Sequence, residues 1–150
     1  MAEMIKQILT LSQLGLLSLQ DVRKKEVSVF LLLLLTGTGA VFAFSGLDPE
    51  NLQAWGMTLA AVLIPGFLML LFSRLPGGRI GVADGWVVMA LGLVSMDFGI
   101  LMNSLMYGML FCGAAGLFLL VRGKKGKKDT VPFIPFLSAG YLAELILQNI

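Results

Sequence analysis

Histidine is absent from this chain, and the single cysteine, Cys112, lies inside an apolar stretch. Zinc and haem sites are usually assembled from several cysteine and histidine side chains at short spacings. We therefore expect neither a metal nor a cofactor. One cysteine also excludes a disulfide within the chain, so cysteine usage does not indicate a redox compartment.

Charged residues are scarce as well: they make up 13% of the 150 residues, against 57% hydrophobic residues. A soluble domain typically carries about 25% charged residues. A helix that crosses a bilayer needs roughly 20 apolar residues, so the chain has room for about six crossings and for no further soluble domain. We expect one all-α transmembrane domain over residues 1–150, without a removable signal peptide.

Apolar runs alternate with short charged or glycine- and proline-rich breaks, which is typical of a helical bundle in a membrane. The predicted spans are 4–20, 27–45, 54–73, 84–100, 102–121 and 131–149. The first run contains Lys6 and Gln13, and it could instead be an amphipathic helix on the membrane surface. The fourth and fifth runs are separated only by a break around Asp97-Phe98-Gly99.

The distribution of basic residues predicts the orientation, because Lys and Arg accumulate in short cytoplasmic loops. With six spans, the connections 21–26, 74–83 and 122–130 fall on one side and contain ten of the eleven basic residues. Only Lys6 lies elsewhere. We therefore expect these three connections in the cytoplasm and both termini outside a prokaryotic plasma membrane.

Small residues allow helices to approach closely in lipid. The glycines predicted to pack the spans are Gly37, Gly39, Gly92, Gly108, Gly113 and Gly116.

Ionisable residues at membrane depth are functional hypotheses, because they are costly to bury. Asp21 and Asp84 fall at the cytoplasmic ends of the first and fourth predicted spans, so the topology predicts that they can meet. Two neighbouring carboxyl groups can share one proton and activate a water molecule. Asp97 belongs to the other side and is interpreted as a turn residue, and Glu144 could either snorkel or pair with a polar neighbour.

Three motifs accompany these aspartates in order along the chain. They are Asp21-Val22-Arg23-Lys24-Lys25-Glu26-Val27, Gly81-Val82-Ala83-Asp84-Gly85 and Pro132-Phe133-Ile134-Pro135-Phe136-Leu137. Together they resemble the motifs of type IV prepilin peptidases and archaeal preflagellin peptidases, membrane aspartic proteases with a GxGD signature. Ala83 stands where a second glycine is commonest, and Glu26-Val27-Ser28 stands where Ile-Pro-Asn is usual. The cysteine-bearing N-terminal domain that the longer members use for methylation is missing.

The resemblance implies catalysis by Asp21 and Asp84 at the cytoplasmic face, on prepilin-like or pseudopilin-like substrates of pilus or secretion systems. Small residues at Gly81 and Ala83 would let a substrate backbone approach Asp84. A purely structural alternative is that Asp84 caps its helix and that Asp21 is a charge partner of the basic loop.

A second hypothesis is a non-catalytic transport or assembly subunit in which the aspartates bind an ion or a helix. In either case we expect the lipid bilayer as a partner and no nucleic acid, while the oligomeric state stays open.

Overall fold

A computed structural model of the chain describes residues 2–24, 26–47, 49–75, 81–122 and 132–149. Six α-helices fill most of these ranges, and no strand occurs in them, as expected for an all-α chain. The helices are α1 (Ala2–Lys24), α2 (Val29–Ser45), α3 (Leu52–Ser73), α4 (Val82–Ser95), α5 (Phe98–Val121) and α6 (Ile134–Gln148), and a single 3-10 turn, η1 (Pro49–Asn51), precedes α3.

The break between α4 and α5 falls slightly earlier than predicted. Met96 adopts a left-handed backbone conformation with φ 47°, which ends α4 after Ser95. Asp97 then caps α5, because its Oδ1 accepts a hydrogen bond from the Ile100 N–H at 3.0 Å. The fourth run, predicted to reach residue 100, is therefore five residues too long.

Two helical segments, Pro49–Ser73 and Phe98–Val121, are long and apolar enough to cross a membrane. Only 11% and 17% of the residues in their most apolar windows are buried within the chain. The core helix of a soluble protein would be mostly buried by its own chain. Packing within this chain leaves most of the apolar surface of these two helices exposed. Three further apolar helices, α2, α4 and α6, have 17, 14 and 15 residues, fewer than the roughly 20 of a perpendicular crossing.

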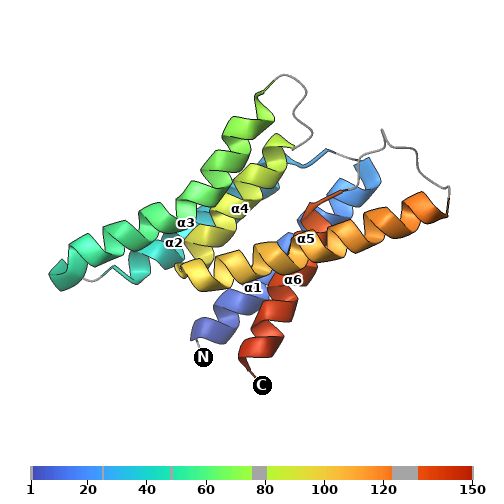
Figure 1. Cartoon of the computed structure of the whole chain (residues 1–150). Coiled ribbons are helices and arrows are strands. Elements are labelled where there is room, and N and C mark those ends of the chain that lie inside the picture. Colours follow the sequence, from blue (N-terminus) through green and yellow to red (C-terminus); the bar gives the residue numbers. More distant parts are fainter. Residues whose placement is uncertain (1, 25, 48, 76–80, 123–131, 150) are drawn as a thin grey trace.

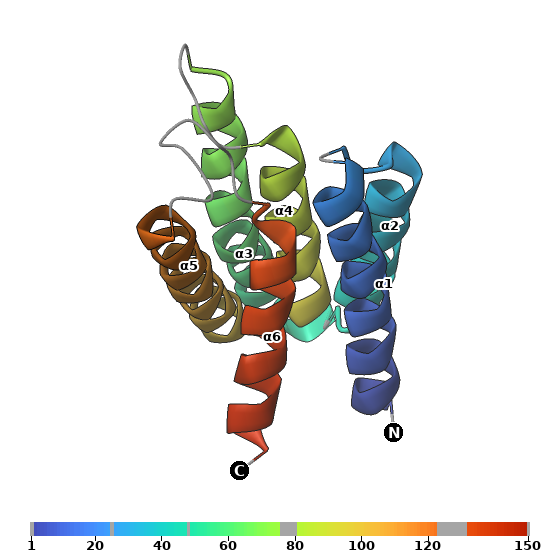
Figure 2. The ribbon, with the colours of Figure 1, turned by 90° about the vertical axis from the view of Figure 1, so that its right-hand side faces the viewer.

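The helices pack in two groups of three (Figures 1 and 2). In one group α4 packs against both α2 and α3, and in the other α6 packs against both α1 and α5. Thinner contacts of α1 with α2 and of α4 with α5 join the groups, and one continuous apolar core runs through both. We call the boundary between α2–α3–α4 and α1–α5–α6 the seam.

Helix α1 is an integral part of this bundle. It lies alongside α6 in Figure 2, and its Leu14 and Leu17 are fully buried. Gln13, one of the residues that weakened the first run, accepts a hydrogen bond from the Thr38 hydroxyl of α2 at 3.0 Å. The Gln13 side chain therefore contributes to helix packing, although α1 is not among the helices that are long and apolar enough to cross a membrane.

Glycines make the closest helix contacts within each group. A Cβ added at Gly92 would collide with the Val62 carbonyl of α3, and one at Gly39 would lie 2.9 Å from the Ala90 carbonyl oxygen of α4. Gly108 approaches Leu137 of α6 in the same way. These three glycines confirm the packing prediction.

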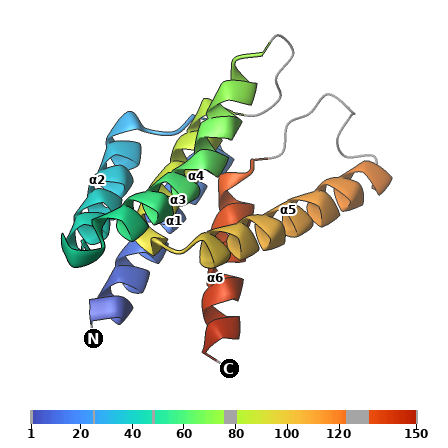
Figure 3. The ribbon, with the colours of Figure 1, turned by 60° about the vertical axis from the view of Figure 1, so that its left-hand side comes forward.

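The same prediction is wrong for the other three glycines. Gly37, Gly113 and Gly116 have no atom within 4 Å of an added Cβ. Gly113 and Gly116 lie in the second half of α5, which projects away from the other helices in Figures 1 and 3. Its buried residues, Leu101, Ser104 and Gly108, all belong to the half that contacts α6.

Candidate active site

Asp21 lies in the last turns of α1 and contacts the beginning of α6. Its Oδ2 accepts a hydrogen bond from the Ile134 N–H at 3.3 Å. Ile134 is the first residue of α6, so this N–H has no acceptor within its own helix. The first and third sequence motifs therefore meet at the carboxyl group of Asp21.

Two further hydrogen bonds fix the end of α1 around Asp21. The hydroxyls of Ser18 and Ser138 are 3.0 Å apart and join α1 to α6. The Gln20 side-chain oxygen accepts the Ser28 N–H at 2.9 Å and joins α1 to the start of α2. The sequence analysis missed both contacts, although Ser18 and Asp21 are three residues apart and share one face of the helix.

Asp84 lies in the first turn of α4. Its Oδ2 accepts a hydrogen bond from the N–H of Gly81, the residue that caps this helix, at 3.2 Å. A Cβ added at Gly81 would lie 3.0 Å from the same oxygen, closer than nearly all real Cβ contacts. Glycine at this position therefore leaves the carboxyl group uncrowded, while Ala83 packs against the apolar core.

The backbone beneath Asp84 is held against α3 by Gly85, whose added Cβ would meet Leu70 at 2.8 Å. Gly66 of α3 approaches Met89 and the Gly85 carbonyl of α4 equally closely. Neither glycine was predicted as a packing residue. In the sequence, Gly66 lies one turn before Leu70, and Gly85 directly follows Asp84. These positions do not reveal which helix each glycine contacts.

The fold brings Asp21 and Asp84 to the same end of the bundle, on opposite sides of the seam. Figure 2 shows the end of α1 and the starts of α4 and α6 at one end, and both termini at the other. The carboxylate of Asp21 exerts an electrostatic effect on Asp84, whereas no hydrogen bond joins the two carboxyl groups directly. Both side chains are half-buried.

Burial from water raises the pKa of the Asp21 carboxyl above its ordinary value, and the hydrogen bond from Ile134 offsets part of this effect. Asp21 directly follows the first predicted span, residues 4–20, and so lies outside it.

Asp97 is exposed at the far end of α4 and caps α5, which agrees with its interpretation as a turn residue.

Glu144 is buried in the contact between α5 and α6, with 4% of its surface exposed. Its Oε1 accepts hydrogen bonds from the Asn103 side chain at 3.1 Å and from the Gln148 side chain at 2.9 Å. The expected polar pairing of Glu144 is confirmed. Within the described ranges, no three histidine, cysteine or acidic side chains come together in a way that could hold a metal ion.

Some of the residues considered in the sequence lie outside the described ranges. These are Lys25, residues 76–80 of the connection 74–83, and residues 123–131. Of the ten basic residues assigned to one side, Arg23, Lys24, Arg74 and Arg122 are described, and all four lie at or next to helix ends.

The geometry can support acid and base chemistry by two carboxyl groups, one of them uncrowded beside a glycine turn. In comparisons with protein-family models, curated proteins and solved structures, no match to this chain is found, so its function has to be argued from these residues and contacts.

Proposed function

We propose that the chain is a multi-pass protein of a prokaryotic plasma membrane. Large apolar side chains are exposed along α2, α3 and α5: Val41, Met57 and Leu117, for example, each have 67% of their surface exposed. Contiguous apolar surface of this extent is covered by lipid or by another protein. Two helices of sufficient length and apolarity are consistent with lipid, and local thinning of the bilayer with snorkelling of flanking side chains accommodates the shorter ones.

Within that membrane, we propose an aspartic endopeptidase that cleaves the leader peptide of prepilin-like or pseudopilin-like proteins. The observation that carries the proposal is that the fold brings Asp21 and Asp84 to helix ends at the same end of the bundle, although they are far apart in the sequence. When a substrate brings the two carboxyl groups together, they cannot both ionise cheaply, and one of them would hold a proton. The ionised partner takes a proton from water, and the protonated one donates a proton to the leaving amine.

The local contacts suit this division of labour. Each carboxyl group accepts a backbone N–H through one oxygen, Asp21 from Ile134 and Asp84 from Gly81, which orients it. A substrate at the cytoplasmic face would present the bond between its basic leader and its apolar helix at this depth. The orientation follows from the basic connections, as argued from the sequence.

The test is co-expression with candidate substrates that carry a basic leader, a glycine and a long apolar run, followed by a gel shift of the product. We expect Asp21→Asn and Asp84→Asn each to lower cleavage at least about 100-fold, the scale of a lost general acid or base. Asp97→Asn is the matched control, because asparagine caps a helix as well as aspartate and Asp97 lies at the other end. Wild-type cleavage rates in both dyad variants would overturn the proposal.

The second candidate is a non-catalytic transport or assembly subunit. It is favoured by the same hydrogen bonds, because an aspartate that caps α4 and one that anchors α6 already have structural roles. Asparagine preserves an acceptor oxygen at both positions. If these hydrogen bonds are the role of the two aspartates, Asp21→Asn and Asp84→Asn should fold like wild type and give the same gel pattern. Failure of the wild-type protein to cleave any substrate in the panel would also support it.

A further inference from the structure

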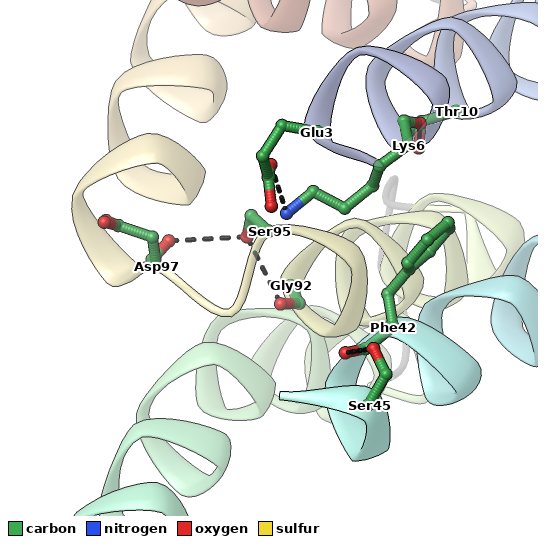
Figure 4. Close-up of polar contacts among 8 residues, drawn as sticks. All are labelled: Glu3, Lys6, Thr10, Phe42, Ser45, Gly92, Ser95 and Asp97. Carbon is green, nitrogen blue, oxygen red and sulfur yellow. Dashed lines mark hydrogen bonds and ion pairs between the residues drawn. The ribbon is translucent and has the colours of Figure 1, made fainter. Parts of the chain in front are cut away.

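A cavity of about 630 Å³ lies at the opposite end of the bundle from Asp21 and Asp84. The first turns of α1, the end of α2, the start of α3 and the end of α4 surround it. Its walls include Glu3, Lys6, Phe42, Ser45 and Trp55. Figure 4 shows Lys6 and Glu3 on one side of this region and Phe42 and Ser45 on the other.

An ion pair gives one wall of the cavity a charged surface. Lys6 Nζ lies 2.7 Å from Glu3 Oε2, and the two side chains are 17% and 74% exposed. Lys6 is also the one basic residue that the positive-inside distribution leaves on this side of the chain. Since a lysine ammonium has three donors and Glu3 engages one, Lys6 can bind an anion while it keeps its acidic partner.

An apolar groove begins where this cavity ends. It has a volume of about 470 Å³, and Leu9, Leu33, Gly37, Val41 and Phe42 are among the residues that line it. Phe42 belongs to both the cavity and the groove. From Phe42 to Leu33 the groove follows α2 for nine residues, roughly 14 Å at the helical rise, toward the middle of the bundle.

Gly37 explains why the groove is open. Nothing lies within 4 Å of a Cβ added there. Because glycine has no side chain, it lines the groove without occupying its volume. A cavity with an ion pair in its wall, next to an apolar groove that shares Phe42 with it, matches the chemistry of a phospholipid, with a charged headgroup and an acyl chain.

We propose that this cavity and groove bind one phosphatidylethanolamine molecule of the outer leaflet. Lys6 binds the phosphate, the Glu3 carboxylate accepts a hydrogen bond from the ammonium group, and an acyl chain lies over Gly37. The adjacent positive and negative side chains suit a zwitterion, and an ammonium with N–H donors satisfies Glu3 better than the quaternary ammonium of phosphatidylcholine. The inference rests on membrane location and does not depend on the aspartate pair.

Trp55 provides a direct reporter, because it lines the cavity and is held by a hydrogen bond from its Nε1 to the Ala43 carbonyl at 3.1 Å. Trp86→Phe leaves it as the only tryptophan, since the chain has two. The Trp86→Phe protein would be reconstituted in phosphatidylcholine vesicles that contain a minor fraction of brominated phosphatidylethanolamine, phosphatidylglycerol or phosphatidylcholine. Quenching of Trp55 fluorescence measures occupancy of the site.

We expect about a tenfold preference for the brominated phosphatidylethanolamine over the brominated phosphatidylcholine, the scale of one charge-assisted hydrogen bond. Glu3→Gln should abolish this preference, because Glu3 contacts the ammonium group by which the two lipids differ, whereas Lys6→Gln should lower quenching by both lipids, because both carry the phosphate. Gly37→Leu should lower quenching by filling the groove, whereas Gly113→Leu, at another glycine with open space around it, should not. Circular dichroism of each variant checks that the helices are retained.

Three results would overturn the proposal. One is equal quenching by the three lipids, and another is a preference for phosphatidylethanolamine that Glu3→Gln leaves unchanged. The third is displacement of the brominated lipid by soluble glycerophosphoethanolamine at a comparable concentration. That result would show that the site binds a soluble ligand with this headgroup and does not require a lipid. Displacement only by intact lipid supports the proposal.

Discussion

Gln20 and Asp21, near the end of α1, tie three helices together. Through Ile134, Asp21 holds the start of α6, and the neighbouring Gln20 holds the start of α2 through Ser28. Asp84 has a simpler setting, with one backbone donor from Gly81 and close packing of Gly85 behind it. At the scale of single residues, the two aspartates therefore differ in the number of helices that are joined around them.

Stability should report the cost of ionising Asp21. Burial raises its pKa, so the folded protein binds this proton more tightly than the unfolded chain, and stability falls as pH rises from about 3.9 through the raised value. An asparagine side chain at this position carries no charge and keeps an oxygen for the Ile134 N–H. We expect Asp21→Asn to unfold at a higher temperature than wild type at about pH 7, with a difference that shrinks toward about pH 4.

Tryptophan fluorescence of the detergent-purified protein during heating would measure this difference. A variant that is less stable than wild type by the same amount at both pH values would contradict the expectation. It would indicate that the carboxylate itself, and not merely an acceptor oxygen, stabilises the fold.

At the scale of helices, the glycine contacts have unequal consequences. Gly92 faces the backbone carbonyl of Val62, which cannot rotate away as the tip of a side chain could. Gly113 faces open space on the projecting half of α5. The same substitution at these two positions therefore separates the effect of helix packing from that of helix propensity.

We expect Gly92→Ala to destabilise the protein by about 1–3 kcal/mol through overpacking of α3 against α4. Gly113→Ala should be neutral or stabilising by up to about 1 kcal/mol, because alanine favours a helix over glycine. Thermal unfolding in one detergent compares the two variants directly. Equal destabilisation by both would indicate that an interface in solution covers the projecting half of α5.

The helices could be predicted from the sequence to a large extent because apolar runs and their breaks are local properties. The end of α4 was misplaced because a left-handed Met96 has no sequence signature comparable to that of glycine. The sequence also named Gly113 and Gly116 and missed Gly66 and Gly85. A glycine's partner is set by how the helices are rotated, which hydropathy does not encode.

The candidate site was predictable in part for the same reason. Asp21 and Asp84 could be assigned to one end of the bundle because helix direction alternates with each span. The contact between Asp21 and Ile134 could not be predicted, since it depends on which helices are neighbours. The motif around Pro132 indicated only that the start of α6 has a role.

At the scale of the whole molecule, the orientation in the membrane can be tested with single cysteines. In a Cys112→Ser background, Arg23→Cys and Arg122→Cys mark the end that carries the aspartates, and Gly46→Cys and Phe98→Cys mark the other end. We expect a membrane-impermeant maleimide to label the second pair in intact cells and the first pair only after permeabilisation. This follows from the positive-inside distribution.

The reverse pattern of labelling would place the aspartates outside the cell and contradict cytoplasmic cleavage. Identical labelling of all four positions in intact cells would contradict a bundle that threads the membrane. Immunoblotting for each variant controls for expression.

The seam gives the bundle a mechanical property. Each group of three helices has its own close glycine contacts, whereas the contacts of α1 and α5 with α4 between the groups are thin. Because Asp21 belongs to one group and Asp84 to the other, their separation is set by how the two groups dock. In the membrane that we propose, the thickness of the bilayer would act on that docking. We then expect the spacing of the two carboxyl groups to depend on lipid composition as well as on sequence.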